Sequence, residues 1–265
     1  MVFVCTVGGY KTSTNTTYTR TELREMLRRG DTSISTSYDP EDEPEGNGRL
    51  NNWAFSSIDY DDYDEFGGIN GIMKATLAVN KVTTTSSSTK QVGRTIIGQI
   101  HADDNEPIRL YYHKLPGNEN GAIYFAHETS KEGLDADHEY WFNLLGNMIQ
   151  DGDENIEYAD GYEGGDIVDT SNPVDGIALD EQFSYTIEVD GHVLMVSITQ
   201  DDELLAYKEF YMVNSGYDDP EDYMYFKAGI YLNDKTSDED DYAKVSFYEL
   251  SNDHEDYEDE SELMD

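Results

Sequence analysis

The stretch that decides the fold reads Tyr225-Phe226-Lys227-Ala228-Gly229-Ile230-Tyr231. Its polar and aromatic side chains alternate with apolar ones, and successive side chains of a β-strand point to opposite faces. The alternation predicts a strand with Tyr225, Lys227 and Tyr231 on one face and mainly apolar residues on the other. We expect the apolar face to pack in the core and the opposite face to line a site.

Two other short stretches show the same alternation, Arg20-Thr21-Glu22-Leu23-Arg24 and Gln99-Ile100-His101. As strands, the first places Arg20, Glu22 and Arg24 on one face, and the second places Gln99 and His101 on one face. Beside residues 225–231 in one sheet, they would form a groove floored by Arg, Gln, His, Lys and Tyr side chains. Such a floor suits the binding of a carboxylated sugar and the removal of a proton next to its carboxylate.

Segments rich in β-branched and aromatic residues recur along the chain, which is typical of an all-β protein. We predict strands at 2–7, 52–58, 70–82, 94–101, 108–115, 121–127, 183–189, 192–199, 204–213, 223–232 and 243–250. Asp190-Gly191 between two of them predicts a two-residue hairpin turn. The pattern favours one antiparallel β-sandwich domain over residues 1–250. The acidic tail at 251–265 has little to bury and is expected to be disordered.

Residues 19–30 allow a second interpretation. Thr19 and Glu22 fit the capping box of a helix, the apolar residues at 23, 26 and 27 would form one stripe, and Gly30 would end the helix. Periodicity alone slightly favours this helix over a strand.

The composition is strongly acidic, with 57 acidic and 17 basic residues and a formal net charge of −40 over 265 residues. Binding of nucleic acid requires dense Lys and Arg, so we expect no nucleic-acid partner. An acidic surface suits a salt-rich medium, where screening acts over roughly 8 Å or less, and indicates a marine or halophilic source. Basic residues gather near the N-terminus, where they form either a solvated basic face or a site for an anionic ligand.

The sequence gives little support to a metal or membrane site. Cys5 is the only cysteine, which excludes an intramolecular disulfide and a cysteine-rich zinc site. Asp151-Gly152-Asp153-Glu154-Asn155 begins like a calcium-binding loop, but Ile156 stands where that loop needs glycine. No stretch approaches the roughly 20 apolar residues that cross a bilayer. We expect no metal, no cofactor and no membrane partner, and a secreted monomer whose signal peptide is not part of this sequence.

Taken together, Arg20–Met26, Gln99-Ile100-His101 and residues 225–231 resemble the three motifs of alginate lyases of polysaccharide lyase family 7. Each motif is short, but their order, spacing and near-complete match are specific, and the similarity covers residues 2–250. The resemblance implies a β-jelly-roll sandwich with an open substrate groove across its concave sheet. It also favours the strand interpretation of residues 20–26.

The resemblance implies that alginate is cleaved by β-elimination, which removes the C5 proton, expels the C4 oxygen and leaves an unsaturated uronate at the non-reducing end. It assigns Arg20, Gln99 and His101 to the substrate carboxylate, where fixed donors stabilise the developing charge. It assigns Tyr231 as the acid and, on mannuronate, also as the base, with His101 as the base on guluronate. Further substrate-binding residues that it implies are Asn15, Glu22, Arg24, Tyr225, Lys227 and Asn233.

Further expectations concern individual residues of this site. A free tyrosine has a pKa of about 10, so a tyrosinate base requires nearby cations such as Lys227. We expect Glu22 to hold arginine side chains rather than to catalyse. By the resemblance, Ile100 is associated with activity on guluronate-containing blocks. The third motif continues as Leu232-Asn233-Asp234 where the family often has Asn-Gln, which bears on a sugar contact.

Two other functions stay open on the sequence alone: a non-catalytic glycan-binding module on the same sandwich, and a lyase of another polyuronate such as glucuronan. A binding module would not need Gln99, His101 and Tyr231 together, which tells against it. No pair of carboxylates stands out among the 57 acidic residues as the pair of a glycosidase.

Overall fold

The structure is a computed structural model that describes residues 1–11, 13, 16–28, 30–33, 49–134, 136, 138–150, 156–158 and 167–255. Within these residues the regular structure is almost entirely β-strand, and the helices are two short 3-10 turns, η1 (Arg49–Asn51) and η2 (Tyr60–Glu65). None of the described helices has the length and apolar character needed to span a membrane.

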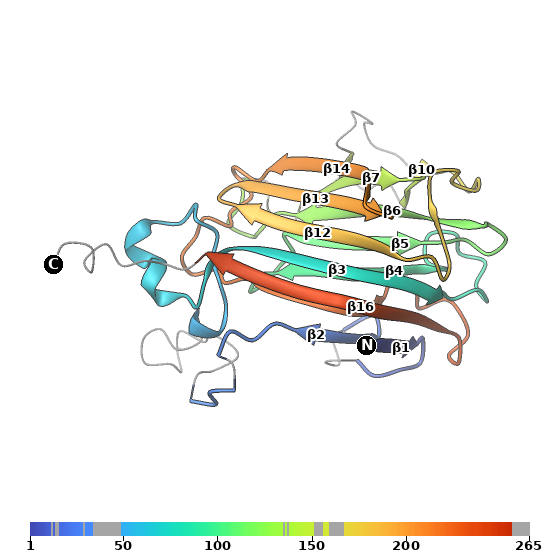
Figure 1. The fold of residues 1–265 in the computed structure, drawn as a ribbon, viewed down its shortest axis with the longest axis horizontal. Helices are drawn as coiled ribbons and strands as arrows, with labels where there is room; N and C mark the ends of the chain where they lie inside the picture. Colours follow the sequence, from blue (N-terminus) through green and yellow to red (C-terminus); the bar gives the residue numbers. More distant parts are fainter. Residues whose placement is uncertain are drawn as a thin grey trace.

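The first sheet contains β1 (Val2–Thr6), β3 (Ile69–Lys81), β12 (Phe183–Asp190), β13 (Val193–Gln200), β14 (Glu203–Tyr211) and β16 (Tyr242–Glu255). These six strands lie in the order β1-β16-β3-β12-β13-β14, and every neighbouring pair is antiparallel. This sheet forms the nearer layer in Figure 1.

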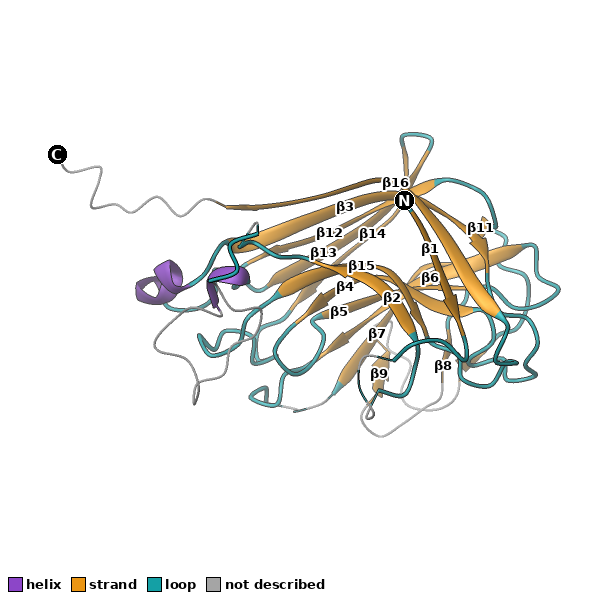
Figure 2. Ribbon diagram, turned by 90° about the horizontal axis from the view of Figure 1, so that it is seen from below, coloured by secondary structure: helices purple, strands orange, loops and turns teal. Residues whose placement is uncertain are grey.

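The second sheet contains β2 (Arg20–Arg24), β15 (Tyr225–Leu232), β4 (Arg94–His101), β5 (Ile108–His113), β6 (Asn120–Glu128), β7 (Glu139–Leu145) and β9 (Ile156–Tyr158), in this spatial order. β11 (Ile177–Ala178) pairs with β6, and β8 (Ile149–Gln150) pairs separately with β10 (Ile167–Val168). Only β7 and β9, among the described pairs of this sheet, run parallel. Figure 2 shows the two sheets stacked as the layers of a sandwich, so the predicted fold class is confirmed.

The core lies between the sheets and is filled by apolar side chains from their inner faces. β15 contributes Phe226, Ala228, Ile230 and Leu232, and none of them is more than 3% exposed. The ring of Trp53 packs on Phe226 with 4.9 Å between centroids. Burial of this kind stabilises the fold by roughly 25 cal/mol per Å² of apolar surface. The alternation predicted for residues 225–231 is therefore confirmed.

One strand prediction is wrong, and the strand β7 was missed. Residues 52–58 do not form a strand, because Trp53 and Ala54 make only isolated bridges to Met224 and Ile69. The aromatic residues of this segment are buried in the core, which explains their strand-like composition. β7 was not predicted because its residues do not alternate: buried Trp141 and Phe142 are adjacent.

The predicted hairpin at Asp190-Gly191 is present between β12 and β13, with its loop one residue later. Asp190 pairs with Val193, so Gly191 and His192 form the two-residue loop. Gly191 has φ of 55°, a conformation that glycine adopts without strain.

The helix interpretation of residues 19–30 is wrong, because Arg20–Arg24 pairs along its length with β15. Tertiary pairing overrides the local helical pattern here. The strand ends at Arg24 rather than at Met26.

The predicted domain end at residue 250 is also wrong. β16 continues to Glu255, with Asn252 opposite Met73 and Glu255 opposite Ile69 on β3. The prediction rested on acidic composition, and the strand forms because β3 offers it a continuous partner edge. Residues 256–265 of the predicted tail lie outside the described residues.

Candidate active site

Strand β15 forms the centre of the candidate site, with β2 on one side and β4 on the other. Each polar residue of β15 lies directly opposite predicted site residues of its neighbours: Lys227 opposite Arg24 and Gln99, Tyr231 opposite Arg20, and Tyr225 opposite His101. The three stretches singled out in the sequence are therefore adjacent strands of one sheet. Their polar side chains share the face that points away from the core.

Gly229 allows β2 to approach β15 at the middle of the site. Its φ is +146°, and a Cβ atom there would lie 2.5 Å from the carbonyl oxygen of Thr21 and 2.8 Å from Cα of Glu22. A side chain at this position would push the strands apart. The glycine between Lys227 and Tyr231 thus sets how closely β2 meets them.

Two arginines of β2 lie over tyrosine rings of β15. Cζ of Arg20 is 3.8 Å from the ring centroid of Tyr231, and Cζ of Arg24 is 3.9 Å from that of Tyr225. Nη2 of Arg24 also donates a hydrogen bond to Oδ1 of Asn52 at 3.1 Å. Cation–π contacts are worth about 0.5–2 kcal/mol each, so both tyrosines are held with a cation against the ring face.

Glu22 holds two polar neighbours. Its Oε2 lies 2.8 Å from Nζ of Lys227, and its Oε1 accepts a hydrogen bond from Nε2 of Gln99. Gln99 has no exposed surface, and the Lys227 side chain is 10% exposed. The prediction that Glu22 holds arginine side chains is wrong, because Arg20 and Arg24 turn instead onto the tyrosine rings.

His101 is fixed as a neutral imidazole with a defined tautomer. Its Nδ1 lies 2.5 Å from the carbonyl oxygen of Ala102, which can only accept, so Nδ1 carries the hydrogen and Nε2 the lone pair. The ring stacks on Tyr225 with 5.0 Å between centroids. Burial lowers the pKa of His101, Glu106 opposes this effect, and Lys227 adds to it. The free Nε2 can therefore accept a proton near neutral pH.

Tyr231 keeps its proton in this environment. Burial raises the pKa of Tyr231, and the cation of Arg20 opposes the rise without cancelling it. The expectation that Lys227 would promote a tyrosinate is not met, since Lys227 is paired with Glu22. Tyr231 is thus suited to donate a proton.

An ionic cluster beside His101 was missed by the sequence analysis. Oε1 of Glu106 lies 3.5 Å from Nε2 of His101. Arg109 lies within 4.0 Å of Glu106 and 3.4 Å of Glu128, and it also pairs with Glu139. No sequence pattern distinguishes Glu106 among 57 acidic residues, because only the fold of the β4–β5 connection brings it to the histidine.

Comparison with known proteins places this geometry in a family. A family model described as alginate lyase matches residues 1–254 of the chain. The chain belongs to this alginate lyase family. A curated relative, an alginate lyase of Klebsiella pneumoniae, is 44% identical over 254 residues, which are 96% of this chain and 75% of the relative. The resemblance to alginate lyases of polysaccharide lyase family 7 is thereby confirmed, and the protein is an enzyme.

Solved structures agree with the family. The crystal structure of an alginate lyase from Klebsiella pneumoniae matches with a TM-score of 0.81 at 43% identity, over 96% of this chain and 81% of that one. The exolytic family 7 alginate lyase from Zobellia galactanivorans matches with a TM-score of 0.63 at 19% identity, over 97% of this chain and 85% of that one. The second match shows the shared jelly-roll fold.

One predicted substrate contact of this alginate lyase, Asn233, is not joined to the cluster. Asn233 follows β15, is 7% exposed, and donates its backbone N–H to the carbonyl of Arg94 at 3.1 Å. Its Oδ1 has no hydrogen-bond partner among the described residues. A role for Asn233 in binding stays a prediction, and Asn15 lies outside the described residues.

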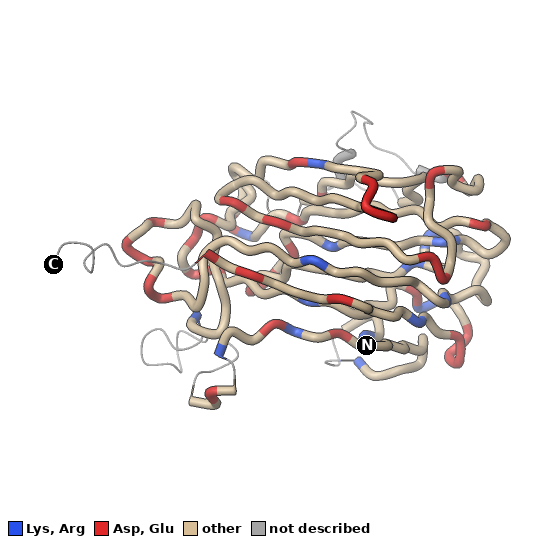
Figure 3. The backbone as a smooth tube through the Cα atoms, in the orientation of Figure 1, with Lys and Arg blue, Asp and Glu red and all other residues tan. Residues whose placement is uncertain are grey.

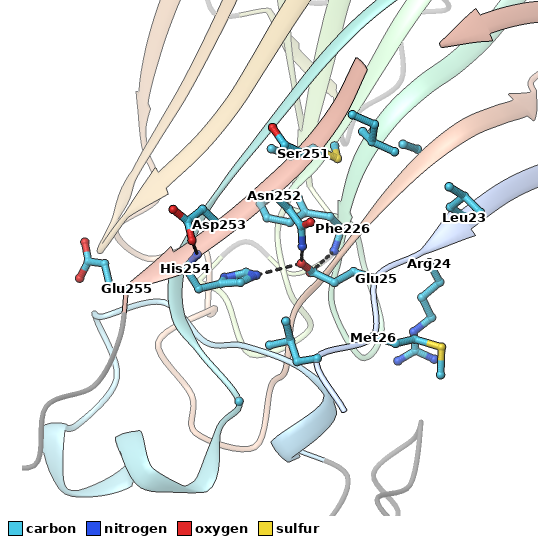
Figure 4. Close-up of a pocket in the computed structure, with 15 residues that line it drawn as sticks. Leu23, Arg24, Glu25, Met26, Phe226, Ser251, Asn252, Asp253, His254 and Glu255 are labelled. Atoms are coloured by element: carbon cyan, nitrogen blue, oxygen red, sulfur yellow. Dashed lines mark hydrogen bonds and ion pairs between the residues drawn. The ribbon is translucent and has the colours of Figure 1, made fainter. Parts of the chain in front are cut away.

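A cavity of about 550 Å³ lies next to the site of the lyase, lined by residues from the end of β2 and from the end of β16. Figure 4 shows Glu25 at its wall, with Asn252 and His254 directed toward the carboxylate. His254 Nε2 lies 2.9 Å from Glu25 Oε1, while Trp53 Nε1 and the N–H of Phe226 donate to Glu25 Oε2 at 2.9 and 3.0 Å. This carboxylate therefore ties the end of β16, in the first sheet, to β15 in the second.

Within the part of the chain that the structure describes, no group of three or more His, Cys, Asp or Glu side chains could hold a metal ion. The segment 151–155, weighed above as a calcium-binding loop, falls outside that part.

Proposed function

We propose that this alginate lyase cleaves its polymer by β-elimination on the face formed by β2, β15 and β4. The observation that carries the proposal is that adjacent strands present Arg20, His101 and Tyr231 on one face as a cation, a neutral base and a protonated phenol. Arg20 lies opposite Tyr231, and its charge also acts on the pKa of His101, which lies opposite Tyr225. This is the set of groups that the chemistry requires.

The first requirement is to neutralise the uronate carboxylate, because a proton next to a carboxylate anion is very weakly acidic. Arg20 supplies a cation at the Tyr231 end of the face. Gln99 is fully buried and donates an amide hydrogen to Glu22, so its direct contact with the substrate carboxylate stays a prediction. Fixed donors of this kind stabilise the negative charge that develops on the carboxylate as the C5 proton leaves.

The second requirement is a base and an acid within hydrogen-bond reach. On guluronate, Nε2 of His101 takes the C5 proton, a double bond forms between C4 and C5, and the bond from C4 to the glycosidic oxygen breaks. The hydroxyl of Tyr231 gives its proton to that oxygen. Transfer of the proton from the histidine to the tyrosinate through water then restores the enzyme.

The same groups support a preference for guluronate-containing blocks. On mannuronate the C5 proton lies on the opposite ring face, where Tyr231 would have to act as the base as well. Because burial raises the pKa of Tyr231, its ionised form is scarce at neutral pH. Ile100 is fully buried in the core and does not touch a sugar, so any effect of Ile100 on preference acts through the placement of Gln99 and His101.

The test is to supply polyguluronate and polymannuronate separately and to follow the ultraviolet absorbance of the unsaturated product. We expect absorbance to rise on both and faster on polyguluronate. A faster rise on polymannuronate would contradict the assignment of His101 as the base. Absence of any rise on either polymer would contradict β-elimination of alginate itself.

The remaining rival is a lyase of another polyuronate. Glucuronan and alginate should be offered at equal concentration of uronate. A higher kcat/KM on glucuronan would favour the rival. The other rival, a non-catalytic module, is not compatible with membership of an enzyme family at 44% identity.

We also propose that the enzyme is secreted, because the polymer is too large to enter a cell. We further propose that it acts as a monomer. Light scattering after size exclusion should give a mass near 30.1 kDa, and a doubled mass would contradict the monomer. Cell fractionation of the source organism should find the activity outside the cells.

A further inference from the structure

Each nitrogen of the His101 ring faces an oxygen atom. Nδ1 donates to the carbonyl of Ala102, and Nε2 faces Oε1 of Glu106 at 3.5 Å. This distance is too long for a hydrogen bond from a neutral ring, and it becomes an ion pair once Nε2 carries a proton. Glu106 is therefore placed to act on the protonated form of the histidine.

Glu106 is kept ionised by its own neighbours. Its side chain is 16% exposed, and burial disfavours its charge, but Arg109 and His101 outweigh this effect and lower the pKa of Glu106. Nε of Arg109 lies 4.0 Å from Oε2 of Glu106. The carboxylate thus stays negative while the histidine takes up its proton.

Glu128 takes the neutral form in the same cluster. Burial raises the pKa of Glu128 to about 8, Arg109 opposes the rise, and Glu106 and Glu139 add to it. A side-chain hydrogen bond joins Glu128 to Glu106. Since Glu106 is the ionised partner, Glu128 donates and Glu106 accepts.

Among the described residues, the other side chains that act on His101 are two cations and an aromatic ring. Lys227 and Arg20 disfavour its protonation, and the ring of Tyr225 stacks on it. Glu106 is the carboxylate that opposes burial and these cations.

We propose that Glu106 is a positioning residue for His101, whose ionised carboxylate orients the ring and stabilises the imidazolium formed when the histidine takes the C5 proton. The pairing of the two residues stands on the geometry alone, while its use in catalysis rests on the function proposed above. Arg109 and Glu128 act one step further out, by holding the charge on Glu106.

The test compares Glu106→Gln with Glu128→Gln. The first removes the charge that faces His101 and keeps the shape of the side chain. The second replaces a neutral acid that donates to Glu106 by a neutral amide that can also donate. An NMR titration of the His101 ring, assigned with His101→Asn, gives its pKa without any substrate, and the pH profile of kcat on polyguluronate gives the catalytic readout.

We expect Glu106→Gln to lower the pKa of His101 and to move the acidic limb of the kcat profile to lower pH, and Glu128→Gln to leave the pKa of His101 near that of the unaltered protein. A merely structural role of Glu106 would not move this limb. An unchanged histidine pKa in folded Glu106→Gln would overturn the proposal. If the pKa falls and the kcat limb stays, the pairing is supported and the assignment of His101 as the base fails. Should Glu106→Gln not fold, Glu106→Asp withdraws the charge by one methylene and should lower the same pKa, and an unchanged value there would also overturn it.

Discussion

In the proposed mechanism Tyr231 gives its proton to the leaving oxygen, and Arg20 lies against one face of its ring. Replacing Tyr231 by Phe keeps the ring and removes the hydroxyl. We expect turnover to fall by about 10²–10⁴-fold or more, the usual share of a general acid, with little change in binding. Initial rates on polyguluronate and calorimetric titration with a short oligomer measure the two quantities. Weakened binding with an unchanged rate would contradict the role of Tyr231.

The site residues were predictable from the sequence where they lie on regular strands. Lys227 and Tyr231 share a face by period alone, and placing the three motifs side by side in one sheet anticipated that β2, β15 and β4 are neighbours, whereas their register came only with the structure. Glu106 was not predictable, because it lies in a connection where no period applies. The partner of Glu22 was also mispredicted, since side-chain choice between lysine and arginine depends on the neighbouring tyrosine rings.

At the scale of elements, the pairing of β2 with β15 depends on Gly229. Gly229→Ala would place Cβ 2.5 Å from the carbonyl of Thr21, so we expect a loss of about 1–3 kcal/mol in the free energy of unfolding and a marked loss of activity. Urea denaturation and initial rates measure both.

The matched control is Gly117→Ala. Gly117 also has a positive φ, +89°, but an added Cβ meets nothing within 4 Å. This variant should lose some stability from backbone strain and keep its activity. Equal loss of activity in both variants would show that the close approach of β2 and β15 is not what matters.

The end of β16 is tied down by His254 and Glu25. Burial opposes protonation of His254, but the hydrogen bond and charge of Glu25 raise its pKa above 6.5. A group whose pKa is raised by folding stabilises the protein fully below its unfolded pKa, and the stabilisation is lost as pH rises through the folded pKa.

We therefore expect His254→Gln to lower the melting temperature most below pH 6.5 and progressively less at higher pH. Thermal unfolding of the unaltered protein and of the variant across this pH range measures the difference in melting temperature. The other acidic groups titrate in both proteins, so their effect cancels in the difference. A difference that grows with rising pH would contradict the pairing of His254 with Glu25. This contact was hidden from the sequence analysis because Glu25 and His254 are far apart in the chain and the tail looked disordered by composition.

At the scale of the whole molecule, the acidic charge opposes folding through self-repulsion. Figure 3 shows Asp and Glu spread over strands and loops of both sheets, and the net charge is −40. Because roughly 1 M salt shortens the screening length to about 3 Å, we expect sodium chloride to raise the melting temperature. Sucrose at equal osmolality is the control without charge. A melting temperature that falls with salt would contradict a destabilising self-repulsion.

The fold class was predictable because strand composition recurs along nearly the whole chain, and the apolar face of β15 could be read residue by residue. The exceptions have a common physical cause. Trp53 is buried with only an isolated bridge to Met224, and residues 251–255 form a paired strand despite being polar, so in both places tertiary contacts decide what local composition does not.

The central claim is that the polymer is cut by elimination and not by addition of water. Digestion of polyguluronate in water enriched in heavy oxygen, followed by mass spectrometry of the products, tests it most directly. Elimination predicts new non-reducing ends that carry a double bond between C4 and C5, and no heavy oxygen introduced by the cut. Saturated products with one heavy oxygen for each bond broken would contradict it.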